Sequence, residues 1–309
     1  MRFPSTACLF FLVLQLVVGP AMGQTGYAEG VTGGAGGPVV EVSTPEALRA
    51  AAAAPGPATI RVRGRMTVGR VAVSSDKTIE GSGPAPTLHG ALAIERGVSN
   101  VIVRNLTITN PSQKKNSEGF DGIAVRGGRR VWIDHCTFKD CGDGMVDVTY
   151  GADNVTVSWC LFKYSSDDLK HRFVMLADGP HKKKSKGRLH LTLHHNWFAD
   201  NCGARMPAAR RSRVHLFNNF FETGGGTSYA TLAREGSEIL SESNFYRNVR
   251  NPSYTEDGGR LRRKGDIFVS SPGKRSKGGD KVFDPPYHYT LDRAVDVPEI
   301  VKAGAGCPL

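Results

Sequence analysis

The sequence predicts an all-β protein folded as a parallel β-helix, and a set of recurring segments is the first observation behind this prediction. Each segment is an alternating apolar run followed by a polar residue and then an aromatic or apolar one. The segments are VIVRNLTI, VWIDHCTF, VTVSWCLF, LTLHHNWF, RVHLFNNFF and EILSESNFY, which end at residues 108, 138, 162, 198, 221 and 246. Intervals of 23 to 36 residues indicate a coiled stack whose turns carry insertions.

A second set of short apolar segments lies between the first ones and is the second observation. These segments are GIAV (122–125), MVDV (145–148), FVML (173–176), ARM (204–206) and SYATL (228–232). Two or more short strands per coil fit a parallel β-helix better than a sandwich, whose strands need hairpin turns. Asn196, Asn219 and Asn244 occupy equivalent places in the repeats, which predicts a hydrogen-bonded ladder at a bend.

The N-terminal part of the chain contains a predicted targeting segment and a predicted helix. Residues 1–23 combine Arg2, an apolar run and the ending Ala-Met-Gly, which is the pattern of a cleaved signal peptide. Residues 24–309 are then expected to form a single secreted, monomeric domain with no segment long and apolar enough to span a bilayer. Thr44 followed by Pro45 starts a helix that we expect to cover the open end of the stack, and no other helix is expected.

The chain is strongly basic, with a formal net charge of +11. Such a surface attracts polyanions. Outside the cell these include acidic polysaccharides, anionic cell surfaces and free nucleic acid, and charge alone does not choose between them. The stretch RMPAARR (205–211) adds three arginines within seven residues; it is either a solvated cluster or a set of groups with a chemical role.

Two aspartates lie at corresponding places in successive coils, and a third lies four residues after the second. Asp121 and Asp143 each precede a glycine and are 22 residues apart, so they are expected to stack at the strand spacing of about 4.8 Å. Asp147 lies on the same side of its strand as Asp143, and a bend at Gly144 would let both reach one ion. Oxygen ligands without His or Cys are typical of Ca²⁺, whereas solvated Asp-Gly turns are the plainer alternative.

The ARM segment is expected to bring Arg205 beside these aspartates on the same sheet. An arginine, a bound cation and basic surroundings suit a substrate that bears carboxylates. They also suit a reaction that removes the proton alpha to a carboxylate and then expels the oxygen substituent at the next carbon, because a cation stabilises the charge that develops on the carboxylate.

These residues carry a family resemblance. The segments GYAEGVTGGAGGPVVEV, NVIVRNLTI, VWIDHCTF, DGMVD, TVSW, RMPAAR and VHLFNNFF, which span about residues 26 to 246, resemble a pectate lyase of polysaccharide lyase family 1. The resemblance implies a right-handed, single-stranded parallel β-helix of the pectin-lyase-like kind. It also implies a Ca²⁺ cofactor, a polygalacturonate substrate rather than nucleic acid or a membrane, and β-elimination to 4,5-unsaturated oligogalacturonides.

The resemblance also implies roles for individual residues. Asp121, Asp143 and Asp147 match the calcium ligands, Arg205 matches the Brønsted base, and Arg210 matches a substrate-binding arginine. The sequence departs from the family where a lysine is usual three residues before Leu176, because Phe173 stands there. The flanking Lys170 and Arg172 are the candidates to replace that substrate contact.

Three other functions remain open from the residues alone. A hydrolase of polygalacturonate would need two carboxylic residues as acid and base, and Asp167 with Asp168 supplies such a pair. A pectin lyase would act on the methylated polymer without the metal. A non-catalytic β-helix would bind acidic polysaccharide through charge. Asp134 next to His135 looks like a catalytic dyad, but the resemblance implies that this segment is a fold signature away from the catalytic groove, which favours a structural role.

Overall fold

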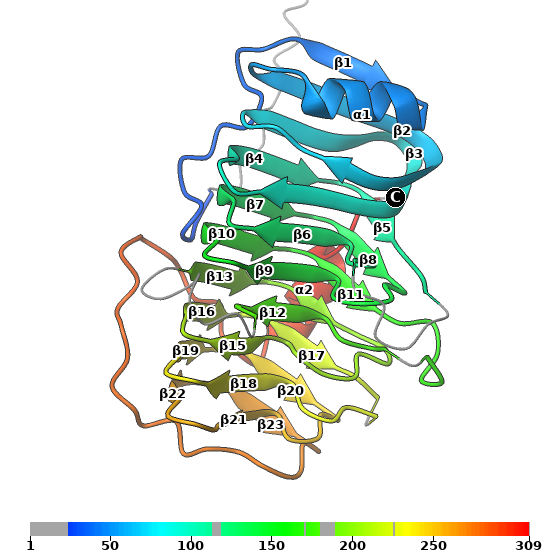
Figure 1. The fold of residues 1–309 in the computed structure, drawn as a ribbon. Helices are drawn as coiled ribbons and strands as arrows, with labels where there is room; N and C mark the ends of the chain where they lie inside the picture. Colours follow the sequence, from blue (N-terminus) through cyan, green and yellow to red (C-terminus); the bar gives the residue numbers. More distant parts are fainter. Residues whose placement is uncertain (1–23, 113–118, 170, 180–188, 225, 309) are drawn as a thin grey trace, which may run out of the picture.

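The computed structural model describes residues 24–112, 119–169, 171–179, 189–224 and 226–308, so the predicted signal peptide lies outside the described residues. Twenty-three strands wind into one coil in which neighbouring strands pair in parallel, and Figure 1 shows the coils stacked from the N-terminal end to the C-terminal end. The predicted parallel β-helix is confirmed. No helix among the described residues is long and apolar enough to cross a membrane.

The strands form three ladders, one along each side of the coil. The β4 ladder contains β1 (Val39–Val42), β2 (Ala58–Ala72), β3 (Lys77–Glu95), β4 (Ser99–Arg104), β7 (Arg129–Asp134), β10 (Asp153–Ser158), β13 (His190–His194), β16 (Arg213–Phe217), β19 (Glu238–Glu242) and β22 (Arg260–Lys264). The β5 ladder contains β5 (Thr107–Thr109), β8 (Thr137–Lys139), β11 (Leu161–Lys163), β14 (Trp197–Phe198), β17 (Phe220–Glu222), β20 (Phe245–Arg247) and β23 (Ile267–Val269). The β6 ladder contains β6 (Ile123–Arg126), β9 (Val146–Thr149), β12 (Met175–Ala177), β15 (Ala208–Arg210), β18 (Thr231–Arg234) and β21 (Ser253–Thr255). The long strand β3 takes part in all three ladders.

Each segment of the first predicted set is two strands rather than one. A residue with positive φ separates the strand of the β4 ladder from that of the β5 ladder, and these residues are Asn105, His135, Trp159, His195, Asn218 and Ser243. Left-handed backbone at a non-glycine residue breaks a strand, and asparagine tolerates it best. The repeat therefore encodes a corner of the coil as well as its sides.

The predicted asparagine ladder is confirmed at this corner. The N–H and the side-chain amide of Asn196 both donate to Oδ1 of Asn219, at 3.0 and 2.9 Å. Asn219 repeats both contacts to Asn244, each at 2.9 Å. All three side chains are fully buried, so the ladder satisfies polar groups that the bend would otherwise leave unpaired inside the protein.

Aromatic rings stack in the interior of the coil beneath the β5 ladder. The ring centroids of successive residues are 4.3 to 5.1 Å apart. The stacked residues are Phe138, Phe162, Phe198, Phe221, Tyr246 and Phe268. Because the coils repeat at the strand spacing, identical positions in the repeat place like rings on top of one another.

Two helices accompany the coil, one of them predicted. The helix α1 (Pro45–Ala53) starts where expected, with Thr44 accepting a hydrogen bond from the N–H of Ala47 at 3.2 Å, and it buries Leu48. Figure 1 shows α1 against the first coils. The expectation of no further helix was wrong, because α2 (Val297–Gly304) buries Val297 and Val301 against aromatic residues of the β5 ladder.

Candidate active site

The aspartates lie together at the start of the β6 ladder, but not in the expected register. Ile123 pairs with Val146, and the N–H of Gly122 donates to the carbonyl of Gly144 at 3.1 Å. Continuing this register places Gly144, not Asp143, opposite Asp121. The expected stacking of Asp121 on Asp143 was therefore wrong by one residue, because the coil here advances by 23 residues rather than 22.

Gly144 brings the carboxylate of Asp147 back toward the other two. A Cβ atom at Gly144 would lie 2.2 Å from Oδ1 of Asp147, so only a glycine leaves room for that carboxylate. The same oxygen accepts a hydrogen bond from the N–H of Leu176 at 3.0 Å. The chain bends at Asp143 and Met145, on either side of Gly144, as the sequence predicted, and the Asp147 carboxylate lies against this glycine.

Burial and mutual repulsion act on these carboxyl groups. Burial, followed by the nearby Asp143, raises the pKa of Asp121 to about 6, although Arg126 lowers it. Burial, followed by Asp121, raises the pKa of Asp147 well above its usual range, and Arg205 is among the groups that lower it. A cluster whose charged form is disfavoured in this way gains stability from any cation that binds it.

The donor chemistry of this cluster fits Ca²⁺, but the chain does not provide a closed cage. Within the described part of the chain, no three His, Cys, Asp or Glu side chains gather closely enough to hold a metal ion by themselves. Ca²⁺ takes 6 to 8 oxygen ligands, so an ion held by Asp121, Asp143 and Asp147 would need waters or substrate carboxylates to complete its shell.

Arg205 lies two coils beyond Asp147, as expected, although the segment that carries it is not a strand. The β6-ladder strand of that coil is β15, which starts three residues later, and only an isolated bridge joins Phe173 to Ala204. Arg205 has a left-handed backbone with φ of 63°, and its carbonyl accepts a hydrogen bond from Met175 at 2.7 Å. Its guanidinium carbon lies 3.9 Å from the centre of the Phe173 ring, so the residue at the usual lysine position contacts the candidate base.

Arg210 and Arg211 are paired with acidic groups at the far end of β15. Arg210 donates to Glu235 at 3.1 Å, and Arg211 forms ion pairs with Glu235 and with Asp178, the latter at 2.9 Å. Their positive charges are therefore compensated. The motif RMPAARR separates into a partly exposed arginine beside the aspartates and two arginines held by carboxylates.

The backbone of Arg172 lies beside the segment that carries Arg205, because its carbonyl accepts hydrogen bonds from Gly203 and Ala204 at 2.8 and 3.1 Å. The guanidinium of Arg172 donates to the carbonyl of Asn201 at 2.9 Å and to that of Gly226 at 3.3 Å, so it joins neighbouring coils. Lys170 lies outside the described residues. Asp134 and His135 contact each other at 2.6 Å at the corner between the β4 and β5 ladders, away from the aspartates, as a structural role requires.

Sequence reasoning overlooked Arg126. It ends β6, and its guanidinium donates to Oδ2 of Asp121 at 3.2 Å. The signal was available, because strand alternation places Arg126 on the same face of β6 as Ala124, and Ala124 pairs with Asp147.

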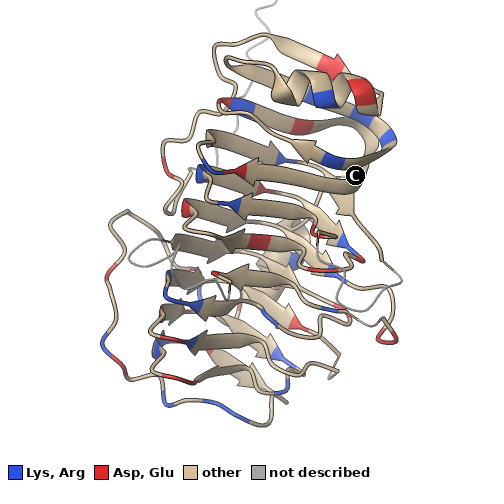
Figure 2. Cartoon of the chain, viewed as in Figure 1, with Lys and Arg blue, Asp and Glu red and all other residues tan. Residues whose placement is uncertain are grey.

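The view in Figure 2 shows basic and acidic residues along the whole stack rather than one face of a single sign. Many of the arginines pair with carboxylates on neighbouring coils, among them Arg61 and Arg104 with Glu80 and Arg247 with Glu222. The high net charge thus coexists with local compensation.

Comparisons with known proteins agree on one family. A family model described as pectate lyase matches residues 6–269. The pectate trisaccharide-lyase of Thermotoga sp. (strain RQ2) is 32% identical over 90% of this chain and 85% of its own, and that of Bacillus licheniformis is 32% identical over 90% and 83%. The structure of pectate lyase Bsp165PelA from Bacillus sp. N165, in complex with trigalacturonate, superimposes with a TM-score of 0.78 at 26% identity and covers 92% of this chain and 98% of its own.

Proposed function

The chain belongs to the pectate lyase family, and from that premise we propose that it cleaves (1→4)-α-D-galacturonan by Ca²⁺-dependent β-elimination. The observation that carries the proposal is the gathering of Asp121 and Asp147 on paired strands of the β6 ladder, with Arg205 two coils beyond Asp147. The trigalacturonate bound to a structural relative supports a uronate polymer as substrate. Family membership as a polysaccharide lyase disfavours the hydrolase and the purely binding alternatives.

The aspartates are the proposed metal ligands. A Ca²⁺ ion bound by Asp121, Asp143 and Asp147 would neutralise the substrate carboxylate and stabilise the charge that develops on it. Asp147 is held by the Leu176 N–H, and Asp121 accepts a hydrogen bond from the N–H of Gly144 at 3.2 Å. These contacts orient the carboxylates before any cation arrives.

Arg205 is the proposed base. It takes the proton from C5 of a galacturonate, the electron pair forms the C4–C5 double bond, and the bond from C4 to the glycosidic oxygen breaks. The departing oxygen receives a proton from solvent. The product carries a 4,5-unsaturated sugar at its new end.

The base must first lose its own proton. A guanidinium group ordinarily does so only above about pH 12. Arg210 and Arg211 are paired with Glu235 and Asp178, so their charges are already compensated and do not favour loss of the Arg205 proton. A cation bound by the aspartates would repel a proton on Arg205. We therefore expect turnover to rise toward alkaline pH.

Arg210 and Arg172 are proposed to act on the substrate only indirectly. Arg210 is 18% exposed and already bound to Glu235, so a substrate carboxylate must compete with that pair. Arg172 fixes the loop positions of Asn201 and Gly226. Lys170 stays a candidate for direct contact with a substrate carboxylate.

Residues 1–23 are proposed to direct secretion and to be removed, leaving residues 24–309 as one catalytic domain. A secreted, monomeric enzyme would meet its polymeric substrate outside the cell.

A single assay tests the proposed reaction. Purified protein is mixed with polygalacturonate, and ultraviolet absorbance and reducing ends are followed together, with calcium or with chelator. Elimination produces both signals, hydrolysis produces reducing ends alone, and binding produces neither. Absorbance that appears with calcium and disappears with chelator supports the proposal, whereas full activity in chelator removes the metal from it.

A further inference from the structure

The four residues from Phe173 to Leu176 form a connecting segment that contacts both Asp147 and Arg205. The N–H of Leu176 donates to Oδ1 of Asp147 at 3.0 Å. The N–H of Met175 donates to the Arg205 carbonyl at 2.7 Å, and the Phe173 ring lies against the Arg205 guanidinium. A shift of the connecting segment would therefore move a proposed metal ligand and the proposed base relative to each other.

Tyr164 holds the start of the connecting segment from inside the coil. Its side chain is fully buried, and its hydroxyl donates to the Phe173 carbonyl at 2.8 Å. The same hydroxyl lies 3.3 Å from the carbonyl of Cys141, two residues before Asp143. Because a phenol has a single proton to donate, the shorter contact, with Phe173, is the stronger one.

The backbone of Tyr164 is tied to the next coil as well. Its N–H donates to the carbonyl of Asp200 at 2.9 Å, and its carbonyl accepts a hydrogen bond from the side-chain amide of Asn201 at 3.1 Å. The chain continues directly from these two residues to Arg205. Tyr164 therefore contacts the coil of Asp147, its own coil and the coil of Arg205.

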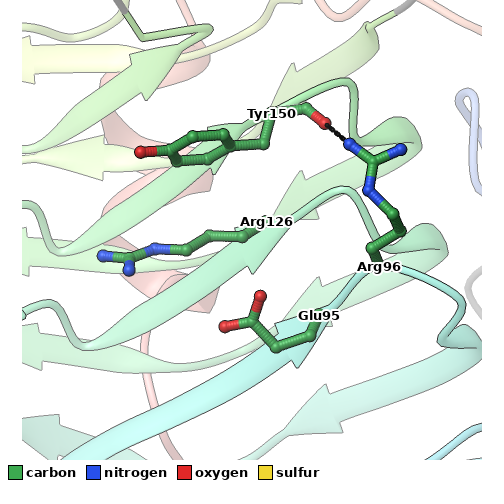
Figure 3. Close-up of a pocket in the computed structure, with 4 residues that line it drawn as sticks. All are labelled: Glu95, Arg96, Arg126 and Tyr150. Atoms are coloured by element: carbon green, nitrogen blue, oxygen red, sulfur yellow. Dashed lines mark hydrogen bonds between the residues drawn. The ribbon is translucent and has the colours of Figure 1, made fainter. Parts of the chain in front are cut away.

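The exposed side of the site is supported in a different way. Figure 3 shows Arg126 between Tyr150 and Glu95 in a pocket of about 270 Å³, and its guanidinium donates to Asp121 at 3.2 Å. This hydrogen bond orients one aspartate from the outside. Tyr164 acts from the interior, on the segment that joins the aspartates to the proposed base.

We propose that Tyr164 is a positioning residue for the elimination reaction, because its hydroxyl fixes Phe173 and the Phe173 ring in turn orients the Arg205 guanidinium. The proposal rests on the proposed function. Tyr164 is buried, so it neither touches the substrate nor exchanges a proton with it. Burial also raises the pKa of Tyr164 well above its usual value, so the hydroxyl stays a donor at the alkaline pH where turnover is expected to be fastest.

The test is Tyr164→Phe, with Tyr246→Phe as the matched control. Tyr246 is also fully buried, its hydroxyl lies 3.3 Å from that of Thr231, and its strand β20 lies three ladder steps beyond β11, the strand before Tyr164. On polygalacturonate at saturating calcium, Tyr164→Phe should lower kcat about fivefold to tenfold, the size of one lost hydrogen bond, with KM within about twofold of wild type. Tyr246→Phe should leave both constants within about twofold.

A double-mutant cycle with Phe173→Leu shows whether the effect passes through Phe173. If it does, adding Tyr164→Phe to Phe173→Leu should lower kcat by less than about a further twofold. All variants are assayed below the temperature at which circular dichroism detects unfolding, so loss of folded protein does not count as loss of kcat.

Three results would contradict the positioning role of Tyr164. They are a kcat equal to that of Tyr246→Phe, a loss confined to KM, and kcat effects that multiply in the double variant. Failure of the proposed reaction would look different, because the wild-type chain would then form no ultraviolet-absorbing product.

Discussion

Phe173 and Arg205 form the contact that most distinguishes this site from the pattern the sequence resembles. The Arg205 guanidinium lies over the aromatic ring at 3.9 Å, while the backbone of Phe173 is fixed by a hydrogen bond from the Tyr164 hydroxyl to its carbonyl at 2.8 Å. An apolar ring at this place does not bind a carboxylate, but it restricts where the guanidinium can point.

Replacing the ring should therefore impair turnover more than substrate binding. We expect Phe173→Leu to lower kcat on polygalacturonate about fivefold to tenfold, the size of a partly desolvated cation–π contact, with KM within about twofold of wild type. Phe173→Tyr keeps the ring and serves as the control. A leucine variant with wild-type kcat would show that the contact does not position Arg205.

Asp147 offers a separate test of the metal ligands. Asp147→Asn replaces a hard anionic ligand by a neutral one, so the calcium concentration for half-maximal activity should rise at least about tenfold. Because burial already disfavours the charged form of Asp147, the melting temperature of the Asp147→Asn variant in chelator should not be lower than that of the wild type. An unchanged calcium requirement would show that Asp147 is not a ligand.

The sequence predicted the residues of the site better than their arrangement. Arg205 lies two coils beyond Asp147 as expected, because their separation follows from the repeat. The register of Asp121 and the pairing of Arg210 with Glu235 were not predictable in the same way. Each depends on loops of unequal length between strands, which shift the pairing by single residues without changing the apolar pattern.

Among the structural elements, the asparagine ladder ends on a different side chain. The N–H and the side-chain amide of Asn244 donate to Oδ1 of Asp266, at 2.8 and 3.1 Å, and the Ser241 hydroxyl donates to Oδ2 at 2.5 Å. Burial is the largest influence on Asp266 and raises its pKa to about 6, against the hydrogen bonds from Ser241 and Asn244 and the charge of Arg263.

This carboxyl group should make stability depend on pH. Its folded pKa lies above the unfolded value of 3.8, so the folded chain binds the proton more tightly, and the stabilisation present below about pH 4 is lost as pH rises through 6. Asp266→Asn should remove this loss and raise the free energy of unfolding by about 2–3 kcal/mol at pH 8. The free energy of unfolding of both proteins is measured in urea at pH 4 and at pH 8. Equal pH dependence in both proteins would contradict the assignment.

The sides of the coil were predictable because apolar alternation marks them, whereas a corner was predictable only where Asn196, Asn219 and Asn244 repeat. A residue such as Trp159, with φ of 50°, carries no composition signal for a bend. The helix α2 was missed for a related reason. Its eight residues are too few for helical periodicity to show, and its stability comes from packing against Phe220 and Phe245 of the β5 ladder.

At the scale of the whole molecule, the basic charge and the aspartates together should select the esterification state of the substrate. A methyl ester carries no charge, so it can neither complete a calcium shell nor form an ion pair with an arginine. We expect a higher initial rate on polygalacturonate than on highly methylated pectin at the same pH and calcium concentration. A faster rate on the methylated polymer that persists in chelator would mean that the aspartates are structural and the enzyme is a pectin lyase.

The rate at which Arg205→Lys forms unsaturated product tests the proposed mechanism most directly. It is measured by ultraviolet absorbance at saturating polygalacturonate and calcium, beside the wild type and Arg211→Ala, whose arginine is held by Glu235 and Asp178. Lysine keeps the charge but moves the basic atom, so kcat should fall by several orders of magnitude while KM stays near the wild-type value, and Arg211→Ala should lose far less. If Arg205→Lys retains more than about a tenth of the wild-type rate, Arg205 only binds the substrate and another group removes the proton.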